Sequence, residues 1–474
     1  MIMKPRLVCP IVDLEWLTWY HARRPPPPQA VEAIKHALES ASVWRIVNHG
    51  VDPQLLDNLR TAGKRFFDQP SVNKRRYAVG ENMDRSRGWE MYPQHWRFHQ
   101  RTMQSINSEQ RAAELVAKND HWWANHPEPS AREGILCERF VCGPPSICSD
   151  DAHLSRPYHP FYDSDFGRVF YERNVWPSDE DVLMKNEEEQ PLRLLPLLRT
   201  SMESTYAALE PIAAASLQCL AAACNLPHDI FDHLVTSNSI THPDAHLRHH
   251  SRLQLNNYPY QIVQLHNSLG NNGQMILPIR ASRHLDTALL TVLCREPNDV
   301  DSGAQHNISR RQVPGSSGTL EVQLHEEDDA IQHWECVPAI NGELIAFVGS
   351  LTPLLTNYAV RPTTHRVSNP PAKHASNSRR MSIGYVLKPD YTAPAMSVTT
   401  TVSNNDEKLI SSTEQISNIM RMEDQEAPVP IVGLIGRVGW QNHMIQTQNA
   451  TRQEAVAGFK SWKIKALARL KSSL

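Results

Sequence analysis

The N-terminal part of the chain alternates between two spacings of apolar residues. The run PIVDL, residues 10–14, is short and apolar as in a strand, and residues 31–41 then carry apolar side chains at helical spacing. The segment VWRIVNHGVD, residues 43–52, predicts a second strand that ends in a turn, and residues 55–66 predict a second amphipathic helix. We therefore expect a strand, helix, strand, helix unit in an N-terminal region of residues 1–93.

A longer helix is predicted from Leu194 to Cys224 because apolar positions recur along it at helical spacing. One face is expected to carry Met202, Tyr206, Leu209, Ala213, Ser216 and Leu220. Pro211 falls inside this helix and predicts a kink, and the sequence Asn225-Leu226-Pro227 predicts its end. We expect residues 191–245 to form supporting helices.

The pattern changes to short strands in the third part of the chain. The strand-like runs are LQLNNYPY, LLTVL, GTLEVQL, GELIAFVG and RRMSIGYVL, separated by Gly, Pro, Asn and charged residues. Short strands without long helices between them are typical of an antiparallel sandwich or a jelly roll. The fold class is therefore a mainly β core, residues 246–392, with flanking helices.

Two segments give less regular patterns. Residues 94–190 mix tryptophans, prolines and acidic stretches without a sustained period, and we expect an insertion or lid there. Residues 393–474 begin as a polar linker and end in a basic, helix-like stretch. The latter is most simply a helix with a solvated cationic face.

Composition excludes several classes of protein. The net charge of −3 gives no reason to expect nucleic acid or an anionic membrane as a partner. Eight cysteines without CxxC pairs argue against a disulfide scaffold and against a cysteine-zinc module. We expect a reducing, cytoplasmic location, no secretory signal, no stretch as long and apolar as a membrane span, and a small-molecule partner. The sequence does not define an oligomeric state.

Polar residues two positions apart interrupt three of the apolar runs. The pairs are Asn256 with Tyr258, His284 with Asp286, and Arg380 with Ser382. A strand projects residues i and i+2 to one face, so we expect each pair to deliver two functional groups to one side of a sheet. A further histidine, His365, stands on an apolar background between the second and third pairs.

These residue types suggest two kinds of chemistry. Two imidazoles and one carboxylate form the facial triad of non-haem Fe(II) oxygenases, and His284, Asp286 and His365 supply that set. Arginine matches a carboxylate with a planar fork of donors, so Arg380, Ser382 and Tyr258 favour a carboxylate-bearing cosubstrate. The HPD motif at residues 242–244 is a second H-x-D, but it has a proline inside and no strand after it, so we interpret it as a polar loop.

At this point the chain resembles the isopenicillin N synthase-like family of Fe(II)/2-oxoglutarate-dependent dioxygenases. The N-terminal run VWRIVNHGVDPQLLDNLRTAGKRFFDQP is similar to the family's N-terminal region, with its NHG turn and FF helix. LQLNNYP resembles the N-x-Y-P strand, HLDTALLTVL the H-x-D stretch, and THRV and RMS the second histidine and R-x-S. The resemblance implies a double-stranded β-helix, a jelly roll of the cupin kind.

The resemblance also implies roles for individual residues. His284, Asp286 and His365 would bind Fe(II), and Arg380, Ser382, Tyr258 and Asn256 would hold 2-oxoglutarate. With O₂, such an enzyme would hydroxylate, desaturate or cyclise a small organic substrate, as in secondary metabolism, and release succinate and CO₂.

The chain departs from the family pattern in its loops. The interval from His284 to His365 and the loop before Arg380 are longer than the family leads us to expect, and Ser350 stands where the family often has an aspartate. These departures affect loop geometry and substrate choice more than the metal ligands.

Three alternatives stay open from the sequence. One is a family oxidase that uses iron and O₂ without 2-oxoglutarate, since such members keep similar motifs. Another is a catalytically silent binding protein on the same fold. The third is a zinc hydrolase that uses the same triad.

Overall fold

The computed structural model describes twelve stretches of the chain. They are residues 7–18, 25–78, 87–93, 135–145, 174–177, 194–235, 250–259, 280–296, 319–325, 333–356, 359–368 and 379–389. Most of the expected 94–190 insertion, the HPD motif and the whole 393–474 segment lie outside these stretches.

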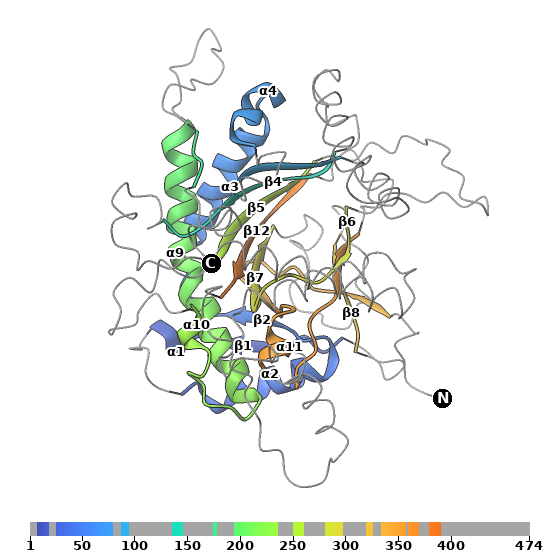
Figure 1. Ribbon diagram of the computed structural model, residues 1–474. Helices are drawn as coiled ribbons and strands as arrows, with labels where there is room; N and C mark the ends of the chain where they lie inside the picture. Colours follow the sequence, from blue (N-terminus) through green and yellow to red (C-terminus); the bar gives the residue numbers. More distant parts are fainter. Residues whose placement is uncertain are drawn as a thin grey trace, which may run out of the picture.

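The strands form two sheets (Figure 1). The larger sheet has eight strands in the spatial order β1 (Ile11–Asp13), β2 (Val43–Val47), β10 (Leu344–Val348), β7 (Leu290–Arg295), β12 (Arg380–Leu387), β5 (Arg252–Tyr258), β4 (Ile135–Cys142) and β3 (Gly88–Pro93). The smaller sheet has four strands in the order β6 (Ala281–His284), β11 (His365–Val367), β8 (Leu320–Gln323) and β9 (Trp334–Cys336). Apart from the parallel pair β1–β2, all of these strand pairs are antiparallel.

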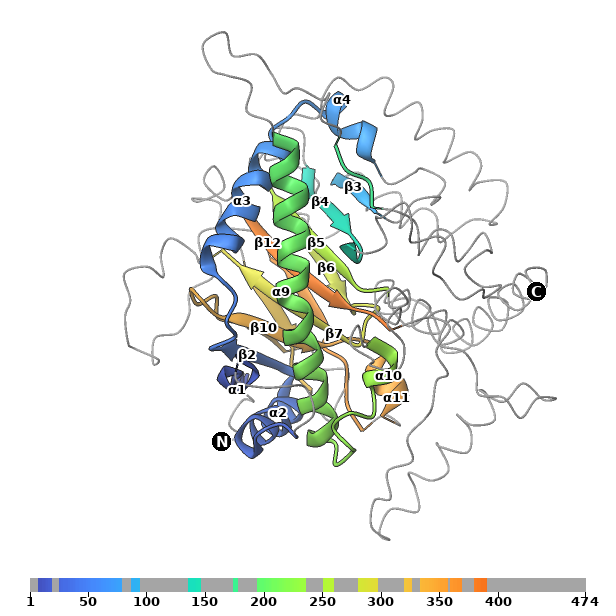
Figure 2. The ribbon, with the colours of Figure 1, turned by 90° about the vertical axis from the view of Figure 1, so that its left-hand side faces the viewer.

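Three helices predicted from the apolar spacing cover one face of the larger sheet or its end (Figure 2). They are α2 (Pro28–Ser40), α3 (Pro53–Phe67) and α9 (Leu194–Ala223). The first turn of α3 is capped because Asp52 accepts a hydrogen bond from the backbone N–H of Gln54, and Pro53 supplies the first helical residue. The shorter helices are α1 (Glu15–Thr18), α4 (Ser71–Lys74), α10 (Asp232–Val235), α11 (Thr352–Leu355) and the 3₁₀ turn η1 (Arg75–Tyr77).

The long helix α9 supports the sheet as predicted. All six residues expected on its buried face are buried, and the ring of Tyr206 meets that of Tyr385 in β12 edge to face at 5.0 Å. The residues before and after Pro211 belong to one continuous helix. It ends where Asn225 takes a φ of 58°, while the N–H groups of Asn225 and Leu226 donate to the carbonyls of Ala222 and Ala221. This Schellman arrangement explains the predicted end.

The same helix corrects one expectation from the sequence. Residues Leu198–Ala223 are long and apolar enough, with a mean hydropathy of 1.2, to pass as a membrane span by length and composition. In the fold, this helix packs against α2, α3 and the larger sheet, and 61% of its most apolar stretch is buried inside the protein. The apolar surface of this helix is therefore covered by other parts of the same chain.

A second apolar cluster fills the space between the two sheets. Ile345 and Phe347 of the larger sheet pack with Leu320 and Val322 of the smaller one. We call the side of the larger sheet that carries Ile345 and Phe347 its inner face. Strand register places Thr291, Val386, Ser382 and Arg380 on the same inner face, because paired residues and residues two apart share a side.

The N-terminal region and the β core share one sheet. β2 pairs with β10, so the predicted strand of residues 43–52 extends the larger sheet at β10. β4, which lies inside the segment expected to be an insertion, pairs with β5 along five positions. The domain boundaries drawn from the sequence stay predictions, but these strands are integral to the sheet.

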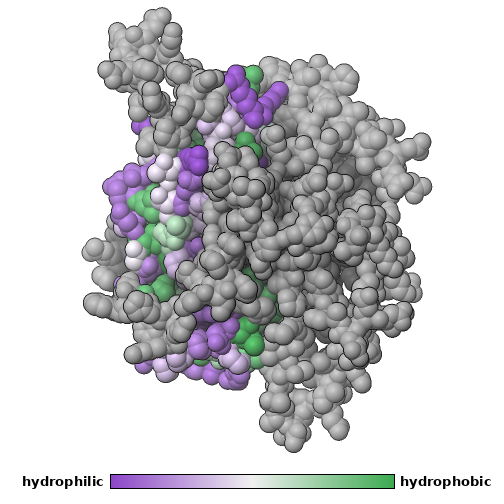
Figure 3. All heavy atoms as spheres, turned by 60° about the vertical axis from the view of Figure 1, so that its left-hand side comes forward, coloured by the Kyte–Doolittle hydropathy of each residue, from purple (hydrophilic) through white to green (hydrophobic). Residues whose placement is uncertain are grey.

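Exposed apolar side chains are scattered over the described surface. The large ones are Val8, Ile11, Val72 and Ile340, which belong to different parts of the fold. On the face shown in Figure 3, hydrophobic side chains form small groups between hydrophilic ones. Single exposed apolar residues of this kind are ordinary on globular proteins.

Candidate metal and carboxylate site

Strand pairing in the smaller sheet brings the two predicted histidines together. β6 ends at His284, β11 begins at His365, and these two residues are direct partners in the antiparallel register. Their ring centroids lie 4.2 Å apart. The side chain of His365 is 6% exposed and that of His284 is 30% exposed, so one imidazole is enclosed and the other borders solvent.

Asp286 reaches the histidines by a route that the sequence did not predict. We expected His284 and Asp286 to lie on one face of one strand, and this was wrong. β6 ends at His284, residues 285–289 cross between the sheets, and β7 begins at Leu290. Asp286 lies in the crossing, where its Oδ1 is 3.6 Å from Nε2 of His284 and 3.8 Å from Nε2 of His365.

Hydrogen bonds decide which atoms of the triad face one another. Nδ1 of His365 donates to the carbonyl of Thr363 at 3.1 Å, which leaves the lone pair on Nε2. The hydroxyl of Thr291 donates to Oδ2 of Asp286 at 2.5 Å, which leaves Oδ1 directed at the imidazoles. Burial by itself would raise the pKa of Asp286, but His365, His284 and the Thr291 hydroxyl outweigh it and lower the pKa, so the carboxylate is the charged ligand form.

The backbone after β10 holds the crossing in place. The N–H and the hydroxyl of Ser350 both donate to the carbonyl of Asp286, at 2.9 and 2.7 Å. The N–H of Gly349 donates to the carbonyl of Leu289, and that of Leu351 to the carbonyl of Ala288. Ser350, the departure from the family pattern, therefore binds the backbone of the candidate ligand.

The three side chains fit a first-row metal ion. Their donor atoms all lie within 4.8 Å of one another. Two ligands that each lie about 2.1 Å from one ion are roughly 3–4 Å apart, and the distances of 3.6 and 3.8 Å from Asp286 agree with this. Two neutral imidazole nitrogens and one carboxylate oxygen are the donor set of a non-haem Fe(II) centre with open positions.

The other two predicted pairs also meet, on the inner face of the larger sheet. In the β5–β12 register Arg380 is opposite Tyr258, and Ser382 is opposite Asn256. The guanidinium carbon of Arg380 lies 5.1 Å from the centre of the Tyr258 ring, and the Asn256 amide donates to the Ser382 hydroxyl at 3.3 Å. Arg380, Ser382 and Tyr258 are all buried. Burial raises the pKa of Tyr258, so its hydroxyl keeps the proton that it can donate.

Sequence reasoning missed a second arginine at this place. Arg280 is 1% exposed, and its guanidinium carbon lies 5.8 Å from the same Tyr258 ring. Burial, and then the charge of Arg380, lower the pKa of Arg280. It donates to the carbonyl of Pro259 at 3.0 Å, which fixes its position. Arg280 stands four residues before His284 in the sequence, and Ser282, two positions after Arg280, is the polar partner that could have marked it.

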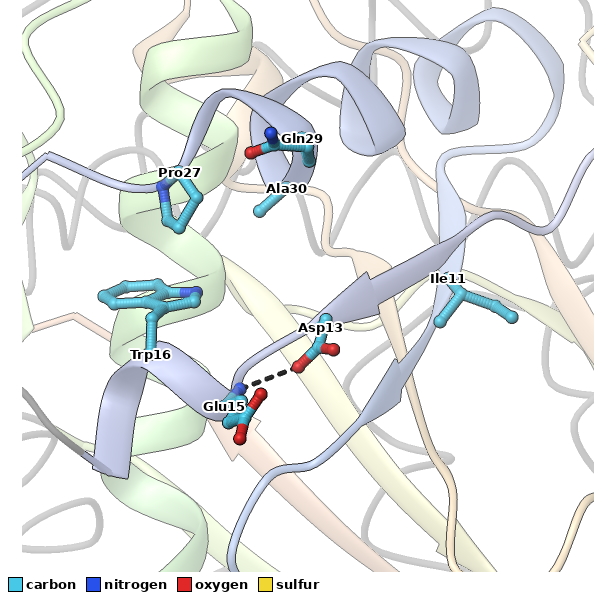
Figure 4. A pocket seen from close by; sticks show the side chains of 7 residues that line it. All are labelled: Ile11, Asp13, Glu15, Trp16, Pro27, Gln29 and Ala30. Carbon is cyan, nitrogen blue, oxygen red and sulfur yellow. Dashed lines mark hydrogen bonds between the residues drawn. The ribbon is translucent and has the colours of Figure 1, made fainter.

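A separate surface pocket lies between β1, α1 and α2 (Figure 4). It has a volume of about 260 Å³ and is lined by Ile11, Asp13, Glu15, Trp16, Pro27, Gln29 and Ala30. Oδ1 of Asp13 accepts a hydrogen bond from the N–H of Glu15, so this carboxylate caps the turn of α1. The pocket shares no residue with the triad or with the Arg380 cluster.

The chain is similar in sequence to known dioxygenases. Residues 9–114 match the family model described as the N-terminal part of the non-haem dioxygenase in morphine synthesis. Validamycin A dioxygenase of Streptomyces hygroscopicus subsp. limoneus is 25% identical over 386 residues, which are 80% of this chain and 77% of that protein. Leucoanthocyanidin dioxygenase of Malus domestica is 38% identical over 58 residues, 12% of this chain and 16% of that protein.

Solved structures share the fold. A full-length Neurospora crassa protein, crystallised in complex with alpha-KG and thymine, has a TM-score of 0.55 at 15% identity, covering 93% of this chain and 99% of that one. A 2OG-Fe(II) oxygenase family protein from Caulobacter crescentus has a TM-score of 0.51 at 18% identity, covering 88% and 100%. The chain is thus similar in sequence to non-haem dioxygenases and in fold to 2OG-Fe(II) oxygenases, and its clustered His-Asp-His triad fits the iron site of such oxidoreductases.

Proposed function

We propose that the protein is an Fe(II)- and 2-oxoglutarate-dependent oxygenase that hydroxylates, desaturates or cyclises a small organic substrate and releases succinate and CO₂. The observation that carries this proposal is the convergence of Nε2 of His284, Oδ1 of Asp286 and Nε2 of His365. The buried Arg380, Ser382 and Tyr258 on the inner face of the larger sheet support the cosubstrate assignment.

Each residue has a separate task in this proposal. Iron, held by the triad, supplies the oxidising chemistry with O₂ and 2-oxoglutarate. Thr363 and Thr291 orient the donor atoms of His365 and Asp286. Arg380 and Ser382 bind the far carboxylate of 2-oxoglutarate, and Tyr258 adds a donor.

Arg280 places a second buried positive charge beside the first over the Tyr258 ring. Two neighbouring guanidinium groups offer two sets of charged donors, so a carboxylate bound here would be stabilised by both.

A small organic substrate is supported by what the similar proteins are named for. The Neurospora structure is a complex with alpha-KG and thymine, and the Streptomyces relative is named for validamycin A. The chemical class of the substrate of this chain is a separate question. A cytoplasmic location and a role in secondary metabolism stay predictions.

Succinate release tests the proposal directly. Purified Fe(II)-loaded protein is screened over candidate metabolites, and we expect substrate-stimulated succinate formation that His284→Ala and Asp286→Ala each abolish. His36→Ala, which changes an exposed histidine on α2, is the matched control and should keep full turnover. Undiminished succinate formation by the two triad variants would contradict the assignment of His284 and Asp286 as metal ligands.

Anaerobic spectroscopy separates the proposal from the family alternatives. A visible charge-transfer band that develops only when 2-oxoglutarate joins the Fe(II) protein supports the cosubstrate. An iron protein that turns over substrate and O₂ without this band is the 2-oxoglutarate-free oxidase, and a protein that binds no Fe(II) is the silent binding protein. Metal analysis of aerobically and anaerobically purified protein identifies a zinc hydrolase.

A further inference from the structure

The inner face of the larger sheet carries basic residues beyond those assigned to 2-oxoglutarate. Along β12 the residues Arg380, Ser382, Gly384 and Val386 share the inner face, and the next position in this alternation is Lys388. The backbone N–H of Lys388 donates to Oγ of Ser251 at 3.0 Å, and the Ser251 hydroxyl donates to the Lys388 carbonyl at 3.2 Å. These bonds continue the extended course of β12 past Leu387.

Lys388 lies on the Asp286 side of this face. Val386, two residues earlier, pairs with Thr291, and Thr291 holds the Asp286 carboxylate. The N–H of Leu289, in the same crossing as Asp286, donates to the carbonyl of Leu387 at 2.9 Å. By this register the half-buried Lys388 lies at the end of β12 that is nearer to the candidate metal centre, and Arg380 lies at the opposite end of the strand.

A second cation flanks the lysine. Arg252 is opposite Val386 in the β5–β12 register and so shares the inner face. Its guanidinium donates to Nε2 of the buried His250 at 2.6 Å, which fixes the position of the arginine. Arg139 is on the same face, opposite Asn256, but it is already paired with Glu90. No described residue makes a hydrogen bond or a close ion pair with Nζ of Lys388.

One inner-face position between these cations and Ser382 carries no side chain. Gly384 lies between Ser382 and Val386 on the inner face and carries no side chain. A Cβ added to it would meet one described atom within 4 Å, Cδ1 of Leu293, at an ordinary distance of 3.5 Å. Packing among the described residues would therefore also accept an alanine at position 384. Because glycine has no side chain, it leaves more space along the inner face of β12.

We infer that Lys388, flanked by Arg252, is the recognition site for an anionic group, a carboxylate or a sulfate or phosphate ester, on the substrate. The inference rests on the proposed function, because it places the substrate anion beside the metal and apart from the Arg380 end that takes 2-oxoglutarate. A bound metal dication takes up the charge of Asp286, which leaves the nearby ammonium without its electrostatic counterpart. An anion from the substrate supplies that counterpart at a largely desolvated position, where charge-assisted hydrogen bonds are strong.

The electrostatics of the lysine agree with this assignment. Burial, and then the charge of Arg252, lower the pKa of Lys388, with Arg139 acting in the same sense and Asp286 opposing them. The surroundings therefore disfavour an isolated ammonium, and a bound anion reverses that preference.

Calorimetry on the loaded protein tests the inference. Fe(II)-loaded protein under nitrogen is first saturated with 2-oxoglutarate, which occupies the Arg380 end, and is then titrated with inorganic sulfate, phenylacetate or phenylacetamide. We expect the two anions to bind and phenylacetate to bind at least about tenfold more tightly than its neutral amide, as one charge-assisted hydrogen bond provides.

Three variants isolate the lysine. Lys388→Met should weaken both anions at least about tenfold and remove the preference for the acid over the amide, whereas Lys388→Arg should keep that preference. Lys35→Met, which removes an exposed charge on α2, should bind the anions like the wild type. Thermal unfolding of each variant verifies that it is folded.

Two results would overturn the inference, and both are distinct from failure of the proposed function. One is that the saturated wild type binds neither anion, or that Lys388→Met binds them within about twofold of the wild type. The other is that Lys388→Met weakens 2-oxoglutarate itself, which would assign the lysine to the cosubstrate. Failure of the proposed function would appear earlier, as a protein that takes up no Fe(II) or no 2-oxoglutarate.

Discussion

At the scale of single residues, the candidate site depends on side chains that are not ligands. The residue types and order in the sequence were enough to predict His284, Asp286 and His365 as a set. Thr291 was visible only as part of an apolar run, and its hydrogen bond to Asp286 arises because the chain crosses between sheets before β7. A contact that depends on the path of the backbone cannot be predicted from a motif.

Thr291→Val should therefore weaken metal binding without removing a ligand. Valine keeps the shape of the side chain but leaves Oδ2 of Asp286 without its donor, and the loss of such an outer partner typically costs about 10–100-fold in metal affinity. Competition with a chelator measures the affinity. Thr205→Val, at a buried threonine of α9, is the matched control and should leave the affinity unchanged. Equal affinities for wild type and Thr291→Val would show that the hydrogen bond does not tune the ligand.

At the scale of elements, the strand pairs were predictable and the connection between sheets was not. The i and i+2 pairs in β5 and β12 meet in register because both strands are regular throughout. Asp286 looked like a strand residue because an apolar run follows it closely. Those residues are buried in the crossing and in β7, so burial produced the apolar run without a continuous strand.

The turn after β10 fixes this crossing, and Gly349→Ala should disturb it. A Cβ at Gly349 would lie 2.1 Å from the carbonyl oxygen of Ala288, so the backbone beside Asp286 has to move. We expect both weaker metal binding and a loss of about 1–3 kcal/mol in the free energy of unfolding, measured by urea titration. Gly384→Ala, whose added Cβ meets Leu293 at 3.5 Å, should change neither quantity appreciably. A Gly349→Ala protein with native metal affinity would contradict the role of the turn.

At the scale of the whole molecule, the N-terminal region completes the sheet that carries the site. β2 pairs with β10, β10 pairs with β7, and β7 follows the Asp286 crossing. The sequence predicted the strands of residues 10–14 and 43–52 correctly. Their place in the larger sheet depends on long-range pairing, which the periodicity of apolar residues does not contain.

Removal of residues 1–52 should therefore abolish cooperative folding. The deletion takes away β1, α2 and β2, so the edge of β10 and the buried side chains of Trp44 and Ile46 lose their places in the core. Circular dichroism during heating should show no sharp transition, whereas a chain that lacks only residues 1–6 should keep one. A sharp transition in the shorter chain would mean that the rest of the fold is autonomous.

The direct pairing of His284 with His365 has a consequence for how freely the chain can grow. Because the register of β6 and β11 sets the two imidazoles, the length of chain between Arg295 and Leu320 does not enter the geometry of the metal site. The entropic cost of closing a loop rises by only about 0.6 kcal/mol for each doubling of its length. The interval that looked too long for the family is thus a place where evolution, or a protein engineer inserting a reporter domain, can add sequence while the candidate metal site keeps its geometry.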